Sequence, residues 1–504
     1  MGREKQNQVK CRIPKRIRQL LILLIWLLLW QLLAVLIHNR ILFVGPVEAF
    51  AALFWQLPTT GFWRTVLHSS FRICGGYLLA FLLGVLFGVL AYKKWYAEEF
   101  LEPAVALLQS IPVASFVILA LIWIGSKNLA VLISFVIVFP VIYRNTLQGM
   151  KAADEQLLEM ADVFGMSAWS RLWYVYRPAL FPYLLAGSRI ACGMAWKSGV
   201  AAEVIGVPEL SIGEKLYMAK IYLSTAELFA WTFVVIVVSR LLERAFLWLL
   251  GQLSVERMGD RRERVANRTE RFEGLREKGV DNFPGRVANR TERFEGMAAA
   301  DRKRWAASSV KVRSLSKAYR EKEVLSDLSF SLEAGQIYCL MGTSGIGKTT
   351  LMRILMGLEV PDKGSAAPEI RPESAISAVF QENRLLGYAD ALDNIRIAGG
   401  RRGLCCTPQE VLQNLIEPEA WQKRTELLSG GMQRRVALAR ALAVRSGLIL
   451  MDEPFTGLDE ETKKRTIQQI LQFREGRTLL VVTHQEEDVQ LLGARVLRMK
   501  WSHQ

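Results

Sequence analysis

The chain has 504 residues, of which 51% are hydrophobic, and this length leaves room for two to four domains. Such a hydrophobic share is high for a chain that is soluble throughout, so we expect membrane-spanning segments. The formal net charge is +16, but no stacking-aromatic RNA motif or basic recognition helix accompanies it, and we expect no nucleic acid partner. The six cysteines have no metal-type spacing, which argues against a zinc site and a disulfide framework.

The first half of the chain contains six apolar segments. Residues 17–37 follow a cluster of lysines and arginines, which predicts a spanning helix with a cytoplasmic N-terminus. This segment is of membrane length and lacks the small-x-small exit of a signal peptide, so we expect it to stay attached. Further spans of about 20 residues are predicted at 71–92, 104–124, 129–147, 183–206 and 228–250. Six spans return the chain to the cytoplasm, and the lipid bilayer is a predicted partner.

Three charged residues lie within the fifth predicted span, namely Arg189, Lys197 and Glu203. Charges inside a span are costly and are functional by default, so these side chains are candidates for lining a translocation path. The alternative is that Arg189 and Glu203 lie near the two membrane surfaces and extend their charged ends into water. Lys197 lies well round the helix from Glu203, so we expect no ion pair between them.

A polar segment, residues 148–182, joins the fourth and fifth predicted spans on the cytoplasmic side. Its pattern predicts a short amphipathic helix, a break at Gly165 and a second helix that ends at Pro178. The segment resembles the coupling loop of ABC importer permeases, whose spacing Glu159, Ala161, Gly165 and Pro178 match, whereas Met160 and Arg177 depart from it. An ordinary surface hairpin is the alternative. Residues 186–206 are similar to the nitrate/sulfonate/taurine branch of these permeases.

A charged linker is predicted between the two halves, from residue 256 to residue 308. It contains an 11-residue repeat, which runs from 264 to 274 and again from 286 to 296. Two copies cannot form a stacked solenoid, so we interpret the repeat as a duplicated spacer. Each copy contains an Asn-x-Thr pattern, at Asn267 and Asn289, but a cytoplasmic linker would not be glycosylated.

The second half opens on a phosphate-loop motif that matches the pattern Gly, four residues, Gly-Lys-Thr. An apolar run, residues 337–341, predicts a strand before the loop, and residues 351–355 predict a helix after it. Glycines let backbone N–H groups surround the phosphates, a lysine neutralises their charge and a hydroxyl binds Mg²⁺. The expected loop contacts are Gly342, Thr343, Ser344, Gly345, Ile346, Gly347, Lys348, Thr349 and Thr350.

Further motifs follow the phosphate loop in the order found in ABC ATPases, which this half resembles over nearly its whole length. Residues 428–435, Leu-Ser-Gly-Gly-Met-Gln-Arg-Arg, are similar to the signature motif, and a buried-strand pattern ends at Asp452 and Glu453. The resemblance implies that Glu453, His484 and Gln381 are catalytic and that Thr349, Gln381 and Asp452 bind Mg²⁺. It implies ATP contacts from Tyr319, Ser429, Gly430, Gly431 and Asp459, although a core tyrosine is the alternative for Tyr319.

The two halves together predict a membrane domain of about six helices, residues 1–255, fused to an α/β phosphate-loop ATPase domain, residues 309–504. We expect no appended regulatory domain. The resemblance implies ATP-driven uptake of a small solute, such as a sulfonate, taurine, nitrate or a vitamin precursor, across the cytoplasmic membrane. Alternatives are an ABC exporter half-transporter and a membrane-tethered regulatory ATPase. The short turn at 92–103 argues against the first, and six spans with a coupling loop argue against the second.

Two protein partners follow from the resemblance. In the family each ATP lies between the phosphate loop of one ATPase and the signature loop of another, and this chain has one of each, so a homodimer is expected. Importers of this kind also receive their solute from a separate extracytoplasmic binding protein. The identity of the solute cannot be derived from the sequence, because selectivity is expected to lie largely with that protein.

Overall fold

The structure is a computed structural model that describes residues 15–39, 41–252, 307–320, 322–368 and 376–499. The chain divides into two compact units, and each is described by itself. The first comprises Met1–Lys151 and Leu180–Gln252, and the second comprises Ala152–Ala179 and Leu253–Gln504. Most of the predicted linker, including both copies of its repeat, lies outside the described residues. The predicted coupling segment belongs largely to the second unit, together with the C-terminal half.

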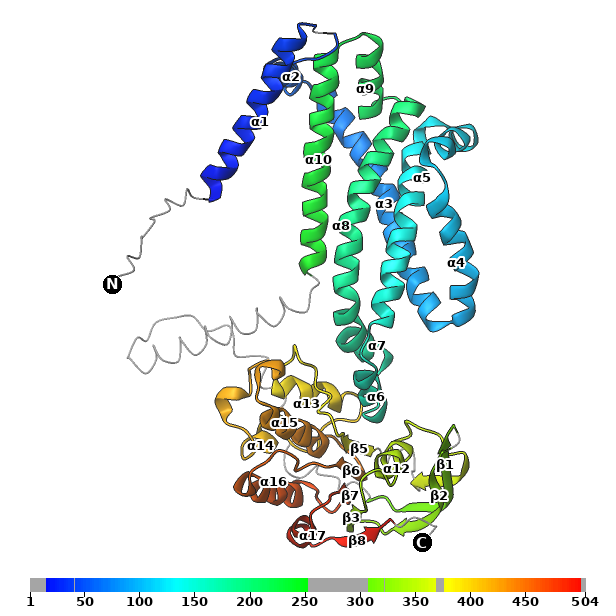
Figure 1. The fold of residues 1–504 in the computed structure, drawn as a ribbon, viewed down its shortest axis with the longest axis vertical. Coiled ribbons are helices and arrows are strands. Elements are labelled where there is room, and N and C mark those ends of the chain that lie inside the picture. Colours follow the sequence, from blue (N-terminus) through cyan, green and yellow to red (C-terminus); the bar gives the residue numbers. More distant parts are fainter. Residues whose placement is uncertain (1–14, 40, 253–306, 321, 369–375, 500–504) are drawn as a thin grey trace, which may run out of the picture. The chain divides into compact units, whose positions relative to one another are not determined.

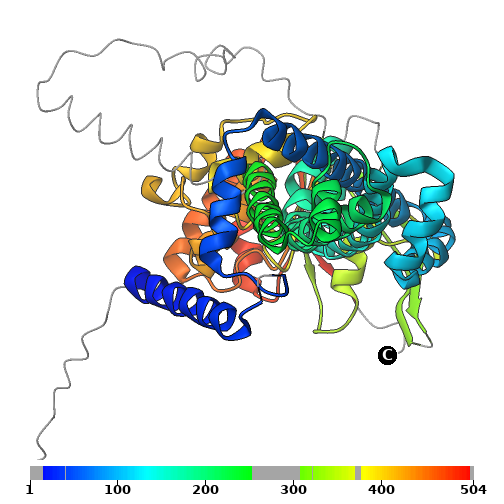
Figure 2. The ribbon, with the colours of Figure 1, turned by 90° about the horizontal axis from the view of Figure 1, so that it is seen from above.

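The described part of the first unit is helical (Figure 1). In Figure 2, α8 and α10 are seen nearly end-on, which agrees with their side-by-side course in Figure 1. The helices are α1 (Lys15–Ile37), α2 (Pro46–Gln56), α3 (Thr60–Lys93), α4 (Trp95–Ser110), α5 (Val113–Lys151), α8 (Arg177–Gly206), α9 (Ile212–Ile221) and α10 (Thr225–Gln252).

Small residues on α3 let this helix pack closely against α5. A Cβ added to Gly76 would lie 2.3 Å from the Val131 carbonyl oxygen, and one added to Gly88 would lie 2.6 Å from the Thr146 Cβ. Gly76, Ala80, Gly84 and Gly88 are all buried and recur at every fourth residue, so they share one face of the helix. Such faces are typical of helix packing in membranes, where close backbone contact replaces the hydrophobic effect.

Three helices are long and apolar enough to cross a membrane, within the described residues: Ile17–Ile37, Thr60–Lys93 and Val113–Lys151. The predicted span at 104–124 is wrong as a single helix, because α4 ends at Ser110 and α5 begins at Val113. The residue before a proline avoids the helical region, and Ile111, which precedes Pro112, is extended with ψ of 125°. The predicted spans at 183–206 and 228–250 lie within the helices α8 and α10, but neither is among these three, so their crossing of a membrane stays a prediction.

Glu203 is fully buried inside the first unit, so it does not extend into water as one interpretation of the sequence predicted. The Ser69 hydroxyl donates to its Oε2 at 2.7 Å, and the Gly213 N–H lies 3.3 Å from the same oxygen. Arg72 lies 3.9 Å from the other oxygen. The carboxylate therefore joins α8 to α3 and to the start of α9, because a buried charge needs partners on several sides.

The described part of the second unit contains two sheets, in agreement with the predicted α/β fold. An antiparallel sheet has the order β2-β1-β4, and a parallel sheet has the order β5-β6-β7-β3-β8. The strands are β1 (Val310–Tyr319), β2 (Lys322–Leu332), β3 (Ile337–Met341), β4 (Lys363–Pro368), β5 (Ile376–Val379), β6 (Leu448–Asp452), β7 (Thr478–Val482) and β8 (Arg495–Arg498).

Helices lie around these sheets in the second unit, and two of them, α6 and α7, belong to the coupling segment (Figure 1). They are α6 (Glu155–Val163), α7 (Ala168–Arg171), α12 (Lys348–Leu355), α13 (Ala391–Gly399), α14 (Pro408–Leu412), α15 (Gly430–Ala443), α16 (Glu460–Phe473) and α17 (Glu486–Leu492). Because the central strands are parallel, the segments after β5, β6, β7 and β3 all leave the sheet at one edge. The phosphate loop and the predicted catalytic residues Gln381, Glu453 and His484 lie in those segments, whereas Tyr319 lies at the end of β1.

Candidate nucleotide site and coupling segment

The phosphate loop joins β3 to α12, and its backbone requires two of its glycines. Gly345 and Gly347 have φ angles of +82° and +99°, a region that L side chains rarely adopt. A Cβ on Gly347 would also lie 2.8 Å from the Val324 carbonyl oxygen of β2. The loop ends at the N-terminus of α12, where free N–H groups and the helix dipole favour an anion.

Lys348 is the first residue of α12, and its side chain turns back over the loop. Its ammonium donates to the carbonyl oxygens of Gly342 at 2.8 Å and Thr343 at 2.9 Å. Burial lowers the pKa of Lys348, whereas the nearby carboxylates of Glu453 and Asp452 raise it. The Lys348 ammonium can therefore exchange these two carbonyl oxygens for phosphate oxygens when a nucleotide binds.

Asp452 ends β6 and lies buried beside the phosphate loop. Burial raises the pKa of this carboxyl most, and the neighbouring Glu453 raises it further, while a hydrogen bond from Thr349 lowers it. The predicted Mg²⁺ ligands Thr349 and Asp452 are therefore in contact. A carboxylate and a hydroxyl at the edge of a phosphate site suit Mg²⁺, which prefers oxygen ligands and completes its shell with phosphate and water.

Glu453 follows Asp452 with a φ of +48°, a conformation that is rare outside glycine. Its N–H donates to the Val482 carbonyl oxygen of β7 at 3.1 Å. Its Oε1 lies 3.0 Å from Nε2 of His484, which follows β7. The turn thus directs the two neighbouring acids to different partners, with Asp452 beside Thr349 and Glu453 beside His484.

Gln381 follows β5, and the structure places its backbone rather than its side chain in the network. Its carbonyl oxygen accepts from Nη1 of Arg434 at 3.1 Å. Nη2 of Arg434 donates to the carbonyl oxygens of Asp452 at 2.6 Å and Glu453 at 2.7 Å. In the described part of the chain no hydrogen bond joins the Gln381 side chain to Thr349 or Asp452. Arg434, whose role the sequence analysis missed, therefore fixes the ends of β5 and β6 relative to each other.

The signature residues lie at the N-terminus of α15. Ser429 caps this helix by accepting from the Met432 N–H at 3.3 Å. A Cβ added to Gly430 or Gly431 would meet no atom within 4 Å, so the surface here is open. The exposed N-terminus of a helix with small residues suits contact with an anion that another molecule carries.

Asp459 lies at the N-terminus of α16 and acts as its cap. Its carboxylate accepts from the Thr462 N–H at 2.9 Å and from the Thr462 hydroxyl at 2.7 Å. The backbone hydrogen bond from Thr462 is the main cause of the lowered pKa of Asp459. Gly457, with φ of +79°, turns the chain between Glu453 and this cap. The structure thus shows a capping role for Asp459, and a nucleotide contact stays a prediction.

Tyr319 ends β1 and begins a chain of polar contacts. Its hydroxyl donates to Oε1 of Glu359, and a hydrogen bond with Thr350 joins it to the phosphate loop. Oε2 of Glu359 lies 3.4 Å from Nε of Arg353 on α12. The Tyr319 side chain is 44% exposed, so its ring is accessible rather than part of the core. This exposure suits the predicted stacking on a base.

The coupling segment packs against the ATPase-like domain within the second unit. Met160, Ala161 and Phe164 of this segment share a hydrophobic core with Met352 of α12 and Phe380 after β5. Arg440, which is fully buried, lies with its guanidinium carbon 5.1 Å from the centre of the Phe164 ring. The segment is therefore no free surface hairpin, because its apolar residues are buried among residues on either side of the nucleotide site.

Glu159 on α6 holds two arginines of the ATPase-like domain. Its Oε1 accepts from Nη2 of Arg353 at 2.6 Å, and its Oε2 accepts from Nη1 of Arg384 at 2.6 Å. The hydrogen bond from Arg353 is the main cause of the lowered pKa of Glu159. The ion pairs therefore stabilise docking above a pH of about 4.5 and are lost as the pH falls through the lowered pKa. Arg353 also contacts Glu359, so Tyr319, Glu359, Arg353 and Glu159 form one continuous chain of contacts.

Gly165 provides the break that the sequence predicted, and its φ is +62°. The Gly165 N–H donates to the Asp162 carbonyl oxygen at 3.0 Å, and the Met166 N–H donates to that of Ala161 at 2.9 Å. These two bonds form a Schellman motif, which usually requires glycine at the left-handed position. A Cβ on Gly165 would lie 2.8 Å from Nη2 of Arg402. The glycine thus permits both the end of α6 and a close approach to Arg402.

The predicted helix end at Pro178 is wrong, because the chain stays helical there. A π-helical turn, Leu172–Tyr176, leads into α8, which begins at Arg177 and contains Pro178 in its first turn. Proline cannot donate to the carbonyl four residues before it, which is that of Tyr174. The Tyr388 hydroxyl donates to this carbonyl oxygen at 2.5 Å. A side chain of the ATPase-like domain thus satisfies the acceptor that proline leaves open.

Replacing Gly165 by valine should weaken docking of the coupling segment. A β-branched residue at a positive φ costs about 1–3 kcal/mol, and its side chain would displace Arg402. We expect nucleotide binding to persist and transport-linked ATP hydrolysis to fall. Gly165→Asn is the matched control, since asparagine tolerates this φ better, and it should lose less. Equal, wild-type hydrolysis and uptake in both variants would show that Gly165 has no role in coupling.

The structure brings several predicted site residues together. Lys348 lies on the phosphate loop near the two acids, Thr349 contacts Asp452, and Glu453 contacts His484. Ser429 accepts its hydrogen bond from Met432 within its own segment. The roles of Arg353 and Arg384 could not be predicted from the sequence, because their partner, Glu159, is 194 and 225 residues away. For Arg434, by contrast, the position within the signature run was a usable signal.

Two protein-family models match the chain. Residues 80–250 match the binding-protein-dependent transport system inner membrane component, and residues 325–456 match the ABC transporter family. The first match covers α4, α5, α8 and α9, the C-terminal part of α3 and most of α10, and includes the coupling segment. The second runs from β2 through β6 and includes the phosphate loop, Gln381, the signature residues and the two acids.

Characterised relatives match the second half of the chain. The aliphatic sulfonates import ATP-binding protein SsuB 2 of Rhodococcus jostii is 39% identical over 205 residues, which are 40% of this chain and 82% of the relative. SsuB 1 of Paracoccus denitrificans is 34% identical over 38% of this chain and 79% of the relative. The sulfate/thiosulfate import ATP-binding protein CysA of Pseudomonas aeruginosa is 32% identical over 38% of this chain and 64% of the relative.

Among solved structures, a dimeric ATP-binding cassette with ADP and Pi bound is 28% identical. It covers 38% of this chain and 94% of its own length, with a TM-score of 0.34. The identity to the sulfonate relative extends over most of that protein, and the two family matches lie on the two halves of one polypeptide. The chain therefore belongs to the ABC transporter family and joins a binding-protein-dependent inner-membrane component to an ATPase that binds ATP and hydrolyses it to drive transport.

Proposed function

We propose that this protein drives the uptake of a small solute across the cytoplasmic membrane, with ATP hydrolysis as the energy source. The observation that carries the proposal is that residues 152–179 pack against the ATPase domain. This segment belongs to the permease match, yet its Glu159 holds Arg353 of the phosphate-loop helix and Arg384 near Gln381. Motion of the ATP site is thereby linked to the chain between α5 and α8.

The proposed roles of the site residues follow from their contacts. Lys348 would bind phosphate oxygens, and Thr349 and Asp452 would hold Mg²⁺, which would neutralise phosphate charge when bound. Glu453, in its ionised form, orients the attacking water. His484 positions this carboxylate, because its Nε2 lies 3.0 Å from Oε1 of Glu453. Tyr319 stacks on adenine. Gln381 would lie near the Mg²⁺ ion, and Arg434 holds the Gln381 backbone through its carbonyl oxygen.

We further propose that the working unit is a homodimer. One chain has one phosphate loop and one signature segment, and the open surface at Gly430 and Gly431 suits a γ-phosphate bound to the second copy. Two copies related by a two-fold axis form two equivalent sites. Ser429 and Asp459 of one copy would then complete the site of the other.

The solute is proposed to be an aliphatic sulfonate or a similar small oxyanion, with taurine and nitrate as further candidates. The support is the name of the sulfonate relatives and the resemblance of residues 186–206 to permeases of that class. A separate extracytoplasmic binding protein would deliver it. The N-terminus and the ATPase domain are proposed to be cytoplasmic, as the basic residues before α1 predict.

Replacing Glu159 by glutamine should uncouple the two activities. The variant keeps the size of the side chain but removes the charge that holds Arg353 and Arg384, and charged hydrogen bonds are about twice as strong as neutral ones. We expect basal ATP hydrolysis to persist, and solute uptake per ATP to fall about 10-fold. Glu155→Gln on the exposed side of α6 is the matched control and should transport normally. Unchanged coupling in Glu159→Gln would contradict the proposed link.

A solution assay tests the proposed function as a whole. Candidate binding proteins are first screened by thermal shift against taurine, an alkanesulfonate, nitrate and sulfate, because a bound ligand raises the melting temperature. The transporter in lipid nanodiscs is then mixed with the loaded binding protein, and ATP hydrolysis is measured. Stimulation by the loaded protein supports an importer. Hydrolysis that responds only to a solute without any binding protein would favour an exporter.

A further inference from the structure

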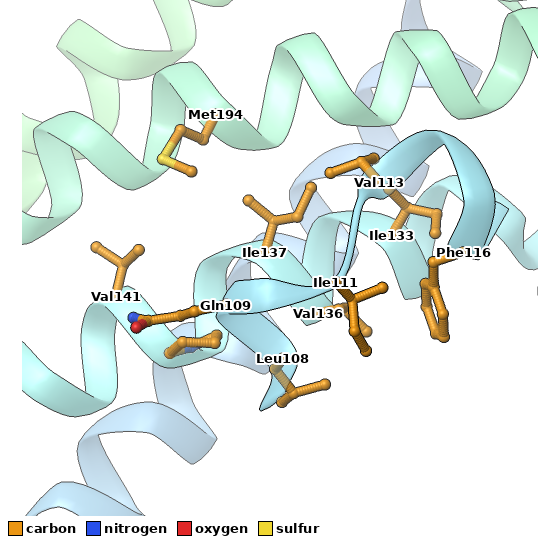
Figure 3. Close-up of a pocket in the computed structure, with 11 residues that line it drawn as sticks. Leu108, Gln109, Ile111, Val113, Phe116, Ile133, Val136, Ile137, Val141 and Met194 are labelled. Carbon is orange, nitrogen blue, oxygen red and sulfur yellow. The ribbon is translucent and has the colours of Figure 1, made fainter. Parts of the chain in front are cut away.

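A cavity of about 270 Å³ lies in the first unit, beside the break between α4 and α5 (Figure 3). Its lining is apolar apart from Gln109, and it includes Ile111 at the break and Met194 of α8. Ligand sites combine apolar walls with several placed polar groups, so this cavity alone does not identify a ligand. The second unit has a more distinctive group outside the residues assigned to the ATP site, which is the pair of adjacent thiols of Cys405 and Cys406.

Cys405 and Cys406 lie between α13 and α14, beside the C-terminal end of α15. Their sulfur atoms are 3.7 Å apart, which is close enough for one thiol to donate a hydrogen bond to the other. Both residues are partly exposed, whereas Cys339 on β3 is fully buried. The pair therefore lies at the edge of the fold, and the core thiol does not.

The surroundings of the pair favour one thiolate. The hydrogen bond with Cys406 is the main cause of the lowered pKa of Cys405, burial opposes it, and the charge of Arg477 lowers this pKa further. Arg477 is buried and donates to the carbonyl oxygens of Leu442 at 2.7 Å and Val444 at 3.0 Å, which fixes its charge. The hydrogen bond with Cys405 raises the pKa of Cys406, so this thiol keeps its proton. Because the thiolate is the nucleophile, Cys405 is the reactive member of the pair.

Cys405 also caps α15, the helix that begins at the signature residues. Its N–H donates to the Ala443 carbonyl oxygen at 2.8 Å. In its protonated form, its thiol donates to the carbonyl oxygens of Leu442 and Ala443, each at 3.2 Å. Carbonyl groups in the last turn of a helix lack partners within the helix, and these bonds satisfy two of them. Arg434 on the same helix holds the backbone of Glu453, so one helix joins Cys405 to the proposed catalytic acid.

We propose that Cys405 and Cys406 form a redox site, at which a small disulfide of the glutathione type oxidises the pair reversibly and thereby lowers ATP hydrolysis. The Cys405 thiolate attacks one sulfur of the small disulfide, whose S–S bond breaks and releases one thiolate. The Cys406 thiol then loses its proton and attacks Sγ of Cys405, which releases the second thiolate. The protein loses two hydrogens, and the small disulfide is reduced to two thiols. The inference concerns the ATPase domain and holds for either direction of transport.

Oxidation removes part of the cap that Cys405 provides. The two sulfur atoms must approach from 3.7 Å to about 2.05 Å, and the oxidised Cys405 has no thiol hydrogen to donate. The carbonyl oxygens of Leu442 and Ala443 then lose a donor at the end of α15. The new bond closes a small ring through the peptide between the two residues, and a strained disulfide is readily reduced. A reversible effect on the ATPase is therefore expected.

Peptide mass analysis together with ATP hydrolysis tests the redox site. The full-length transporter in lipid nanodiscs is treated with glutathione disulfide and afterwards with dithiothreitol. At each stage the free thiols are alkylated before digestion, and the peptide that contains residues 405 and 406 is analysed. The peptide that contains Cys339 is the internal control, because its thiol is buried and burial raises its pKa to about 12. Cys405→Ser and Cys406→Ser are the matched variants.

In the wild type we expect the peptide with both cysteines to lose two hydrogens and ATP hydrolysis to fall about 3-fold or more, and dithiothreitol should reverse both changes. Cys406→Ser should stop at the mixed disulfide between Cys405 and glutathione, because the second thiol is absent. Cys405→Ser should keep its hydrolysis before treatment, since a serine hydroxyl can donate to the same carbonyl oxygens. Its remaining thiol should react about 10-fold more slowly than that of Cys406→Ser.

Free thiols at residues 405 and 406 after treatment of the wild type would overturn the redox site. Complete oxidation with unchanged hydrolysis would overturn its effect on the ATPase. An equal loss of hydrolysis in treated Cys405→Ser would assign the effect to another thiol and contradict the proposal. Faster reaction of Cys405→Ser than of Cys406→Ser would overturn Cys405 as the attacking group. Each outcome is measured without solute or binding protein, so failure of the importer proposal would be recognised separately.

Discussion

Glu453→Gln should bind ATP and fail to hydrolyse it. The substitution keeps the shape of the side chain and leaves the Asp452 carboxylate beside Thr349, but it removes the charge that orients the attacking water. Loss of a general base lowers turnover by about 10²–10⁴-fold. Because glutamine can still accept a hydrogen bond from His484, the turn after β6 should keep its structure. ATP binding by equilibrium dialysis and phosphate release are the two measurements.

The matched control for this variant is Glu419→Gln, an exposed acid of the same domain away from the sheet edge. It should bind and hydrolyse ATP as the wild type does. His484→Ala tests the positioning role separately, since it should lower turnover less than Glu453→Gln and leave ATP binding intact. If Glu453→Gln hydrolyses ATP near the wild-type rate, another group activates the water and the assignment is wrong.

Mixed dimers should regain activity that each parent variant lacks. Lys348→Ala removes the cation of the phosphate loop, and Ser429→Arg blocks the open N-terminus of α15. If each active site takes its phosphate loop from one chain and its signature segment from the other, a dimer of one chain of each kind has one site with both lesions and one intact site. With two different affinity tags the mixed dimer is purified from both parents. We expect about half of wild-type ATP hydrolysis if the two sites work independently.

The parents serve as controls, because both of their sites contain one lesion and each should be nearly inactive. A third dimer has both substitutions in one chain and none in the other. If each active site is formed by both chains, each site of this dimer contains one lesion, and activity should be lost. If the sites instead lay within single chains, the mixed dimer would stay inactive and the third dimer would keep about half its activity.

Much of the nucleotide site could be predicted from the sequence because it is built from local segments. The phosphate loop is continuous, and the strong glycine requirement at 345 and 347 appears in the structure as positive φ angles. The two acids follow a buried strand, and the parallel order of β6, β7 and β3 brings Glu453 to His484. Each of these features depends on short-range patterning together with one general rule about strand ends.

The parts that could not be predicted depend on contacts between distant residues. Nothing near Glu159 in the sequence indicates Arg353 or Arg384, and the choice of these arginines follows only from how α6 packs against α12 and β5. The helix through Pro178 needed the Tyr388 hydroxyl, 214 residues away from Tyr174, to satisfy a free carbonyl. Pro112 was a local sign that a helix ends near residue 111. The predicted span at 104–124 was based on hydrophobicity alone and disregarded this sign.

Uptake into sealed proteoliposomes tests the central claim most directly. The transporter is reconstituted with its ATPase domain facing the lumen, ATP and Mg²⁺ are trapped inside, and the binding protein with radiolabelled taurine or alkanesulfonate is added outside. We predict accumulation of label in the lumen that requires both trapped ATP and the binding protein and that is absent with Glu453→Gln. ATP-dependent loss of preloaded label from the same vesicles, with no accumulation, would contradict import and show that the protein moves its solute outward.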